Sequence, residues 1–127
     1  MNEFDELLEI VAKLRVECPW DQEQTHESLA KHLIEESYEL LDAISKLNTS
    51  TESFDELKNE LGDVLLQIFL HSKIAEEKEF FNMSDVMANL RLKLIKRHPN
   101  IFEDVNLDSA EDVEKQWEKI KQQDSNS

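Results

Sequence analysis

Two groups of acidic residues have a spacing that suits metal binding. Glu36 and Glu39 lie three positions apart, and Glu60 and Asp63 repeat this spacing. In a helix, residues i and i+3 share a face, so each pair can present two carboxylates to one ligand. Carboxylate oxygens without an accompanying Cys/His set favour Mg²⁺ or Mn²⁺ over zinc. The pattern predicts a divalent-metal site between two helices.

The position of each pair relative to the apolar residues supports this prediction. At 100° per residue, Glu36 borders the apolar stripe of its segment, and Glu39 lies about 60° further from it. Glu60 and Asp63 have the same arrangement on theirs. If the two helices pack antiparallel, as the short connection suggests, the four carboxylates meet at one rim, where their repulsion requires a cation.

Two other interpretations compete with a magnesium site. The acids could be ordinary solvated charges, which are common in so acidic a chain. A ferritin-like di-iron site is disfavoured, because it requires Glu-x-x-His on two helices and no His stands at that position after Glu39 or Asp63. Gly62 lies between the acids and costs about 1 kcal/mol relative to alanine in a helix, which close approach of another helix would explain.

Apolar periodicity, capping residues and breaks predict five helices. The first helix is followed by a connection at residues 18–25, and the second helix ends at Asn48 to Thr51. Ser84 or Asp85 caps the fourth helix, and Pro99 ends it. The predicted helices are residues 3–17, 26–47, 53–79, 85–98 and 109–122. The third is apolar almost all round from Val64 to Leu70, so we expect it to be buried on more than one side, with a second subunit completing the burial.

Composition excludes several classes of protein. One glycine and two prolines in 127 residues are too few for a sheet of hairpins or a phosphate-binding glycine loop. We therefore expect an all-α bundle of four to five helices, a single domain over residues 1–121, and a polar, disordered tail at 122–127. A formal charge of −15 disfavours nucleic acid as a partner. One cysteine and the absence of a long apolar run predict a cytoplasmic protein without a membrane span.

Lys93 and Arg97 are candidates for binding an anion. They lie at i and i+4 on the fourth predicted helix, so both heads can reach one target. Arg97 can hold phosphate oxygens bidentately, and Lys93 can act as a point charge. The alternative is that both are surface cations that cover apolar area and pair with Glu.

Several motifs together resemble the MazG-type nucleoside triphosphate pyrophosphohydrolases. They are Cys18-Pro-Trp-Asp-Gln-Glu-Gln-Thr-His26, Glu35-Glu36-x-x-Glu39, Glu60-Leu-Gly-Asp63 and Arg97-His-Pro99, in this order. The resemblance implies an all-α fold and hydrolysis of the bond between the α- and β-phosphates of (deoxy)nucleoside triphosphates. It also implies monophosphate and pyrophosphate as products, Mg²⁺ as cofactor, with Mn²⁺ as a possible substitute, and a homodimer or higher assembly.

The resemblance assigns roles by position. Glu36, Glu39, Glu60 and Asp63 match the family's metal ligands, and Glu35 belongs to the same acidic motif, where it could orient or deprotonate the attacking water. Lys93 and Arg97 match phosphate-contacting positions and would stabilise the departing group. The resemblance further implies that Trp117 and Lys121 can close over the nucleotide, although Trp117 could instead pack with Val113 and Ile120. Asn59 stands where several relatives have a further Glu, and one domain stands where some relatives have two in tandem.

Two alternative functions remain at this stage. One is a relative with a narrow substrate, such as a damaged nucleotide or a compound of the phosphoribosyl-ATP type. The other is a helical interaction module without hydrolytic activity, which would have no need to hold four repelling acids together.

Overall fold

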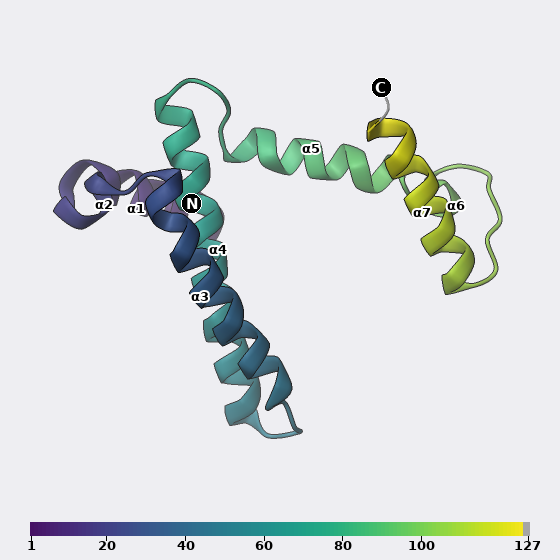
Figure 1. Cartoon of the computed structure of the whole chain (residues 1–127), viewed down its shortest axis with the longest axis horizontal. Coiled ribbons are helices and arrows are strands. Elements are labelled where there is room, and N and C mark those ends of the chain that lie inside the picture. Colours follow the sequence, from purple (N-terminus) through teal and green to yellow (C-terminus); the bar gives the residue numbers. More distant parts are fainter. Residues whose placement is uncertain (126–127) are drawn as a thin grey trace. The chain divides into compact units, whose positions relative to one another are not determined.

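The computed structural model describes residues 1–125, and all the regular secondary structure in this range is helical (Figure 1). The seven helices are α1 (Glu3–Glu17), α2 (Pro19–Glu23), α3 (His26–Ser45), α4 (Thr51–Glu77), α5 (Met83–Lys96), α6 (Pro99–Phe102) and α7 (Ala110–Ser125). The predicted all-α class is confirmed. No helix within 1–125 combines the length and the apolar character needed to cross a membrane.

Side-chain caps fix the starts of the long helices. Asn2 accepts a hydrogen bond from the Asp5 amide at 2.9 Å at the start of α1. Thr25 and Ser28 form a reciprocal capping box at the start of α3, in which each side chain bonds the other residue's amide. Ser50 caps α4 through the Ser53 amide, so α4 begins at Thr51, two positions before the predicted start.

Two short helices were not predicted. Both α2 and α6 begin with proline at the first helical position. A backbone amide at that position has no intrahelical acceptor, so the helix loses no hydrogen bond when proline lacks the amide proton. Helix α4 ends at Glu77 rather than at Glu79, because Glu79 takes a left-handed conformation with φ 63°. The Phe80 amide then bonds the Ala75 carbonyl at 3.0 Å, which closes the helix end.

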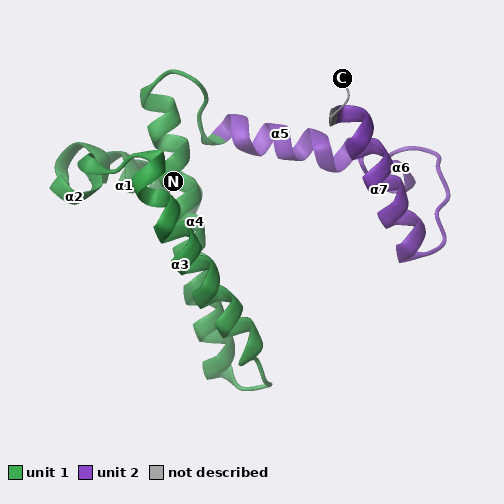
Figure 2. Ribbon diagram, viewed as in Figure 1, with its two compact units in different colours: residues 1–83 green, residues 84–127 purple. Residues whose placement is uncertain are grey.

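The helices divide into two compact units, residues 1–83 and a second unit that begins at Ser84 (Figure 2). In the first unit α3 and α4 form an antiparallel pair, and α1 packs against α4. The core of this unit consists of Val11, Leu29, Phe69, Leu70 and Ile74. The single domain expected over residues 1–121 stays a prediction.

An arginine ties the N-terminal segment of the first unit to α4. The Arg15 guanidinium binds the Glu77 carboxylate at 2.7 Å and donates to the carbonyls of Gln24, at 3.0 Å, and Asp21. This pairing raises the pKa of Arg15 and lowers that of Glu77, mainly through their mutual hydrogen bond. Arg15 therefore holds the connection between α1 and α3 in place.

The second unit contains α5, α6 and α7, in which Pro99 and Ile120 are buried. Helix α7 continues past the predicted end at Gln122 to Ser125. The remainder of the predicted tail, residues 126–127, lies outside the described residues.

Large apolar side chains stay exposed along α3 and α4. On α4, Phe69 and Leu70 are buried, but Leu65, Leu66 and Ile68 are exposed. On α3, the exposed apolar residues are Leu33, Ile34, Tyr38, Leu41 and Ile44. Exposed apolar residues on two paired helices are typical of a protein–protein interface. The predicted second subunit would cover them, and it stays a prediction.

Candidate metal centre

Four carboxylates converge between α3 and α4. Helix α3 contributes Glu36 and Glu39, and α4 contributes Glu60 and Asp63; one carboxylate oxygen from each lies within 4.8 Å of the others. The antiparallel pairing of the helices and the i,i+3 spacing on each produce this convergence. The structure thus brings together the four acids that the sequence places at metal-ligand spacing.

The cluster is electrostatically unfavourable without a cation. Burial, followed by repulsion from Glu39, raises the pKa of Glu36 above its usual value, and the same causes in the same order raise that of Glu60. One oxygen of each, Oε2, is buried and lacks a hydrogen-bond partner within the described residues. A hard divalent cation would satisfy these oxygens and offset the repulsion, so the donor set fits Mg²⁺ or Mn²⁺.

Glu35 lies outside this cluster. Its side chain is 63% exposed, and its Oε2 lies 3.7 Å from Nδ1 of His32. The His32 ring in turn meets the Trp20 ring edge-on, at 5.6 Å between centroids. The Trp20 side chain is exposed, and the backbone carbonyl of Trp20 accepts a hydrogen bond from the Gln24 side chain. Glu35 therefore borders an aromatic pair beside the metal-ligand motif.

In the second unit, Arg97 and Trp117 lie together. The guanidinium carbon of Arg97 is 5.1 Å from the centre of the Trp117 ring, and His98 meets the same ring edge-on at 5.1 Å. Arg97 is only 11% exposed at its side chain and lies 3.7 Å from an Asp124 oxygen. Its Nε is buried without a hydrogen-bond partner in residues 1–125.

The other two predicted substrate contacts are surface residues of this unit. Lys93 is exposed on α5, one turn before Arg97, and Lys121 is exposed on α7, one turn after Trp117. Lys96, which the sequence did not single out, pairs with Asp124. Arg97 and Trp117 thus form a cation–π pair, whereas Lys93 and Lys121 are exposed residues of α5 and α7.

Sequence reasoning missed two polar features on the seam between α3 and α4. The Nδ1 atoms of His26 and His71 lie 2.7 Å apart, with their rings stacked at an angle of 8°. Burial, with a smaller contribution from His26, lowers the pKa of His71. Gln67, one turn before His71, is buried. The only sequence signal was that Glu60, Gln67 and His71 share a line on one helix; nothing singled out His26.

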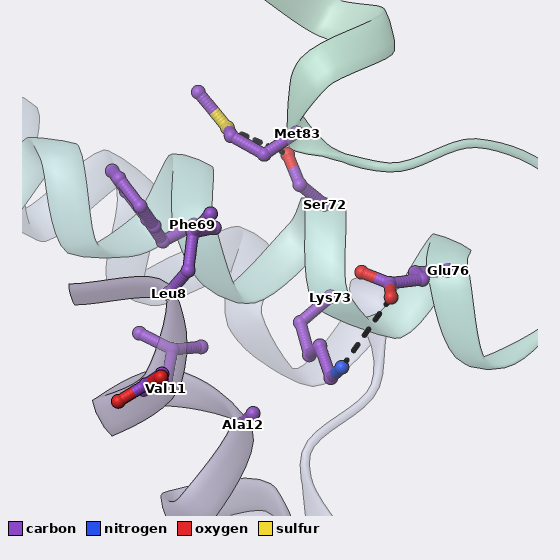
Figure 3. A pocket seen from close by; sticks show the side chains of 9 residues that line it. Leu8, Val11, Ala12, Phe69, Ser72, Lys73, Glu76 and Met83 are labelled. Carbon is purple, nitrogen blue, oxygen red and sulfur yellow. Dashed lines mark hydrogen bonds and ion pairs between the residues drawn. The ribbon is translucent and has the colours of Figure 1, made fainter. Parts of the chain in front are cut away.

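The first unit also has a pocket that does not belong to the carboxylate cluster. A pocket of about 210 Å³ lies between α1 and α4 and is lined mainly by apolar side chains such as Leu8, Val11 and Phe69 (Figure 3). At 100° per residue, its α4 residues lie on the side of that helix opposite Glu60 and Gln67. Lys73 and Glu76 form an ion pair of 3.6 Å along it.

The close approach of another helix expected at Gly62 is not found within the described residues. A Cβ atom built at Gly62 would meet no heavy atom within 4 Å, so no helix described here approaches it closely. Gly62 is exposed on α4 between the two acids.

Comparison with known protein families agrees with this geometry. The MazG nucleotide pyrophosphohydrolase domain matches residues 24–102, which is more than half of the chain and includes all four converging acids. The chain belongs to the MazG family. The resemblance of the short motifs is thereby confirmed at the level of the whole domain.

Individual MazG relatives are similar over almost the whole chain. A nucleoside triphosphate pyrophosphohydrolase/pyrophosphatase MazG of Thermotoga maritima is 49% identical over 95% of the chain. A nucleoside triphosphate pyrophosphohydrolase of Escherichia coli K12 is 41% identical over 95%. The chain spans 45% of the length of each of these curated relatives. The crystal structure of a MazG-related protein from T. maritima covers 93% of the chain and 98% of its own, with a TM-score of 0.74 and 26% identity.

Proposed function

We propose that this protein hydrolyses (deoxy)nucleoside triphosphates to nucleoside monophosphate and pyrophosphate with Mg²⁺, for which Mn²⁺ can substitute. The observation that carries the proposal is the convergence of four carboxylates within 4.8 Å, two of them with a buried oxygen that lacks a partner. An arrangement this repulsive is costly unless it binds a cation. A non-catalytic interaction module would have no use for it.

In this proposal Glu36, Glu39, Glu60 and Asp63 hold the metal. A cation bound there would neutralise phosphate charge and activate a water molecule. Water adds across the bond between the α- and β-phosphates: the bridging P–O bond breaks, and pyrophosphate leaves. Glu35 directly precedes the metal ligand Glu36 in the sequence, so it is the candidate to orient that water or accept its proton.

Phosphate binding also requires positive charge from the chain. A protein with a formal charge of −15 repels a triphosphate unless local cations compensate. Arg97 and Lys93 are proposed to provide this charge and to stabilise the departing pyrophosphate. Trp117 presents an aromatic face beside Arg97 on which a base can stack, and Lys121 lies one turn further along α7.

We further propose that the active form is at least a homodimer. The exposed apolar residues of α3 and α4 flank the metal ligands, and a second copy would remove them from water. Light scattering should show a dimer or larger assembly at micromolar concentration; a stable, active monomer would contradict this part of the proposal.

A substrate panel tests the catalytic proposal. Purified protein is incubated with ribo- and deoxynucleoside triphosphates of each base and with oxidised bases, with Mg²⁺ or with EDTA, and pyrophosphate and monophosphate are quantified. We expect both products in equal amounts and only with metal, as suits clearance of nucleotide pools. Release of orthophosphate, or no hydrolysis of any triphosphate, would contradict the proposal. Hydrolysis confined to one damaged base would identify a narrow-substrate relative.

A further inference from the structure

A buried carboxamide beside the metal centre lacks a hydrogen-bond partner. Gln67 is 6% exposed, and its Oε1 is buried with no donor in the described part of the chain. An unsatisfied buried polar atom destabilises the folded state, and folded proteins seldom keep one without a reason. Leucine or methionine would fill the same space at lower cost. The site therefore calls for a donor that residues 1–125 do not supply.

Gln67 lies on the same face of α4 as two of the metal ligands. At 100° per residue, Glu60, Asp63 and His71 all fall within about 40° of it. The rise of 1.5 Å per residue places Gln67 about 6 Å beyond Asp63 along the helix axis, and His71 about 12 Å beyond. A ligand anchored at the carboxylates that continues along this face meets Gln67 next.

His71 provides a second unsatisfied atom one turn further on. Its Nδ1 is engaged by Nδ1 of His26, whereas its Nε2 is buried without a partner. Residues i and i+4 of a helix lie about 5–6 Å apart at Cβ, so one small polar group can lie between the two side chains. A hydroxyl suits this position, because it donates one hydrogen bond, to Oε1, and also accepts.

Within residues 1–83, buried polar atoms without a partner extend from the metal centre in one direction only. Within residues 1–83, the buried side-chain oxygens and nitrogens without a partner belong to Glu36, Glu60, Gln67 and His71. Toward the loop between α3 and α4 the half-buried and buried residues include Leu40, Ala43 and Leu57, and the half-buried Ser50 and Ser53 are hydrogen-bonded to each other. Unsatisfied polar atoms therefore continue from the metal centre in the direction of Gln67 alone.

We propose that Gln67 and His71 form the sugar subsite of the nucleotide, in which Oε1 of Gln67 accepts a hydrogen bond from a sugar hydroxyl. This inference rests on the proposed function, since the carboxylates must hold the phosphates for the sugar to follow along α4. The sugar is the first part of a nucleotide beyond the α-phosphate, and hydroxyls are its only hydrogen-bond donors. Gln67 is then a residue that determines sugar specificity.

The test compares sugars rather than bases. One nucleoside triphosphate that the protein hydrolyses is supplied as the ribo, 2′-deoxy, 3′-deoxy and 2′,3′-dideoxy forms, and kcat/KM is measured for each. The wild-type protein should lose about 10- to 100-fold on the forms that lack the recognised hydroxyl. Gln67→Met, which keeps length and volume, should lose a similar factor on the hydroxylated forms and hydrolyse the dideoxy form as the wild type does.

A matched control and a binding measurement complete the test. Ser72→Ala also removes a buried polar group from α4, but that hydroxyl bonds the Ile68 carbonyl at 2.8 Å and contacts Met83 Sδ at 3.4 Å on the pocket side (Figure 3). Its sugar preference should equal that of the wild type. Calorimetric titration with the α,β-methylene analogues of the four triphosphates, which cannot be cleaved between the α- and β-phosphates, should rank the four sugars in the same order as kcat/KM does. Because this measurement needs no hydrolysis, it separates failure of the sugar subsite from failure of the proposed activity.

Three results would overturn the sugar subsite. The first is a wild-type protein that treats the ribo and dideoxy forms alike in turnover and binding, which requires no variant. The second is a Gln67→Met protein that loses the same factor on all four sugars, as expected for a structural role only. The third is an unchanged preference in that variant.

Discussion

Replacement of Glu36 with Gln should stabilise the metal-free protein and remove its response to metal. The ligand oxygens of the four acids lie within 4.8 Å of one another. Two unit charges at this separation repel by about 1 kcal/mol in water and by about 3–4 kcal/mol at an effective dielectric constant of 20. Glu36 is partly exposed, so solvent screens its charge and reduces this repulsion. We therefore expect a gain of about 1–2 kcal/mol in the free energy of unfolding.

Magnesium should reverse the order of stability. A ligand at ten times its dissociation constant stabilises the folded state by about 1.4 kcal/mol, and the wild-type protein should show this gain. Glu36→Gln has lost a charged ligand and should show little of it. For a domain of this size 1 kcal/mol corresponds to a change in Tm of about 3–6 °C, which circular dichroism resolves easily.

The measurement is thermal unfolding at neutral pH in EDTA and over a series of Mg²⁺ concentrations, with turnover measured on the same samples. Turnover of Glu36→Gln should fall at least about 100-fold. Glu118→Gln, the same change at an exposed position of α7, should alter neither quantity. If Glu36→Gln melts at or below the wild-type Tm in EDTA, the repulsion argument is wrong. If Mg²⁺ raises both Tm values equally, Glu36 is not a ligand.

Three further predictions follow from the same structure. Arg97→Ala should lower kcat/KM by about 2 kcal/mol, or roughly 30-fold, and Arg97→Lys should recover part of this, because lysine keeps the charge but not the planar fork; a lower Tm with unchanged kinetics would assign Arg97 to the fold alone. Gly62→Ala should raise the free energy of unfolding by about 1 kcal/mol, since a Cβ there meets nothing within 4 Å; a lower Tm together with loss of self-association would instead reveal close approach by a second copy. In EDTA, the Tm advantage of Glu36→Gln over the wild type should grow as the pH rises above about 4.5, the ordinary pKa of a Glu carboxyl. The pKa of Glu36 is raised in the folded protein, so the wild type loses stability as this carboxyl ionises, whereas the Gln variant does not. A Tm difference that is independent of pH would contradict this.

Local features of the sequence predicted the long helices well. Helix α1 has the bounds predicted, and α3 begins where Thr25 suggests, because capping and apolar periodicity act within a few residues. The shorter helices α2 and α6 escaped prediction, since a single turn has too few residues to show a period. The residues proposed as metal ligands were found in the same local way, from i,i+3 spacing on each helix.

The sequence by itself thus determined the all-helical class, the Thr25 cap of α3 and the pairing of acids on two faces, all of which depend on contacts a few residues apart. The predicted cap at Ser84 or Asp85 is wrong, because α5 already begins at Met83. The tertiary structure decided what depends on the register of α3 against α4: that four carboxylates meet within 4.8 Å, and that His26 contacts His71 across 45 positions of sequence. It also decided that Gln67 is buried without a donor, whereas Leu65 and Ile68 stay exposed. A helical pattern shows which residues share a face, but only the packed partner helix determines which of them leave water and which atoms they then meet.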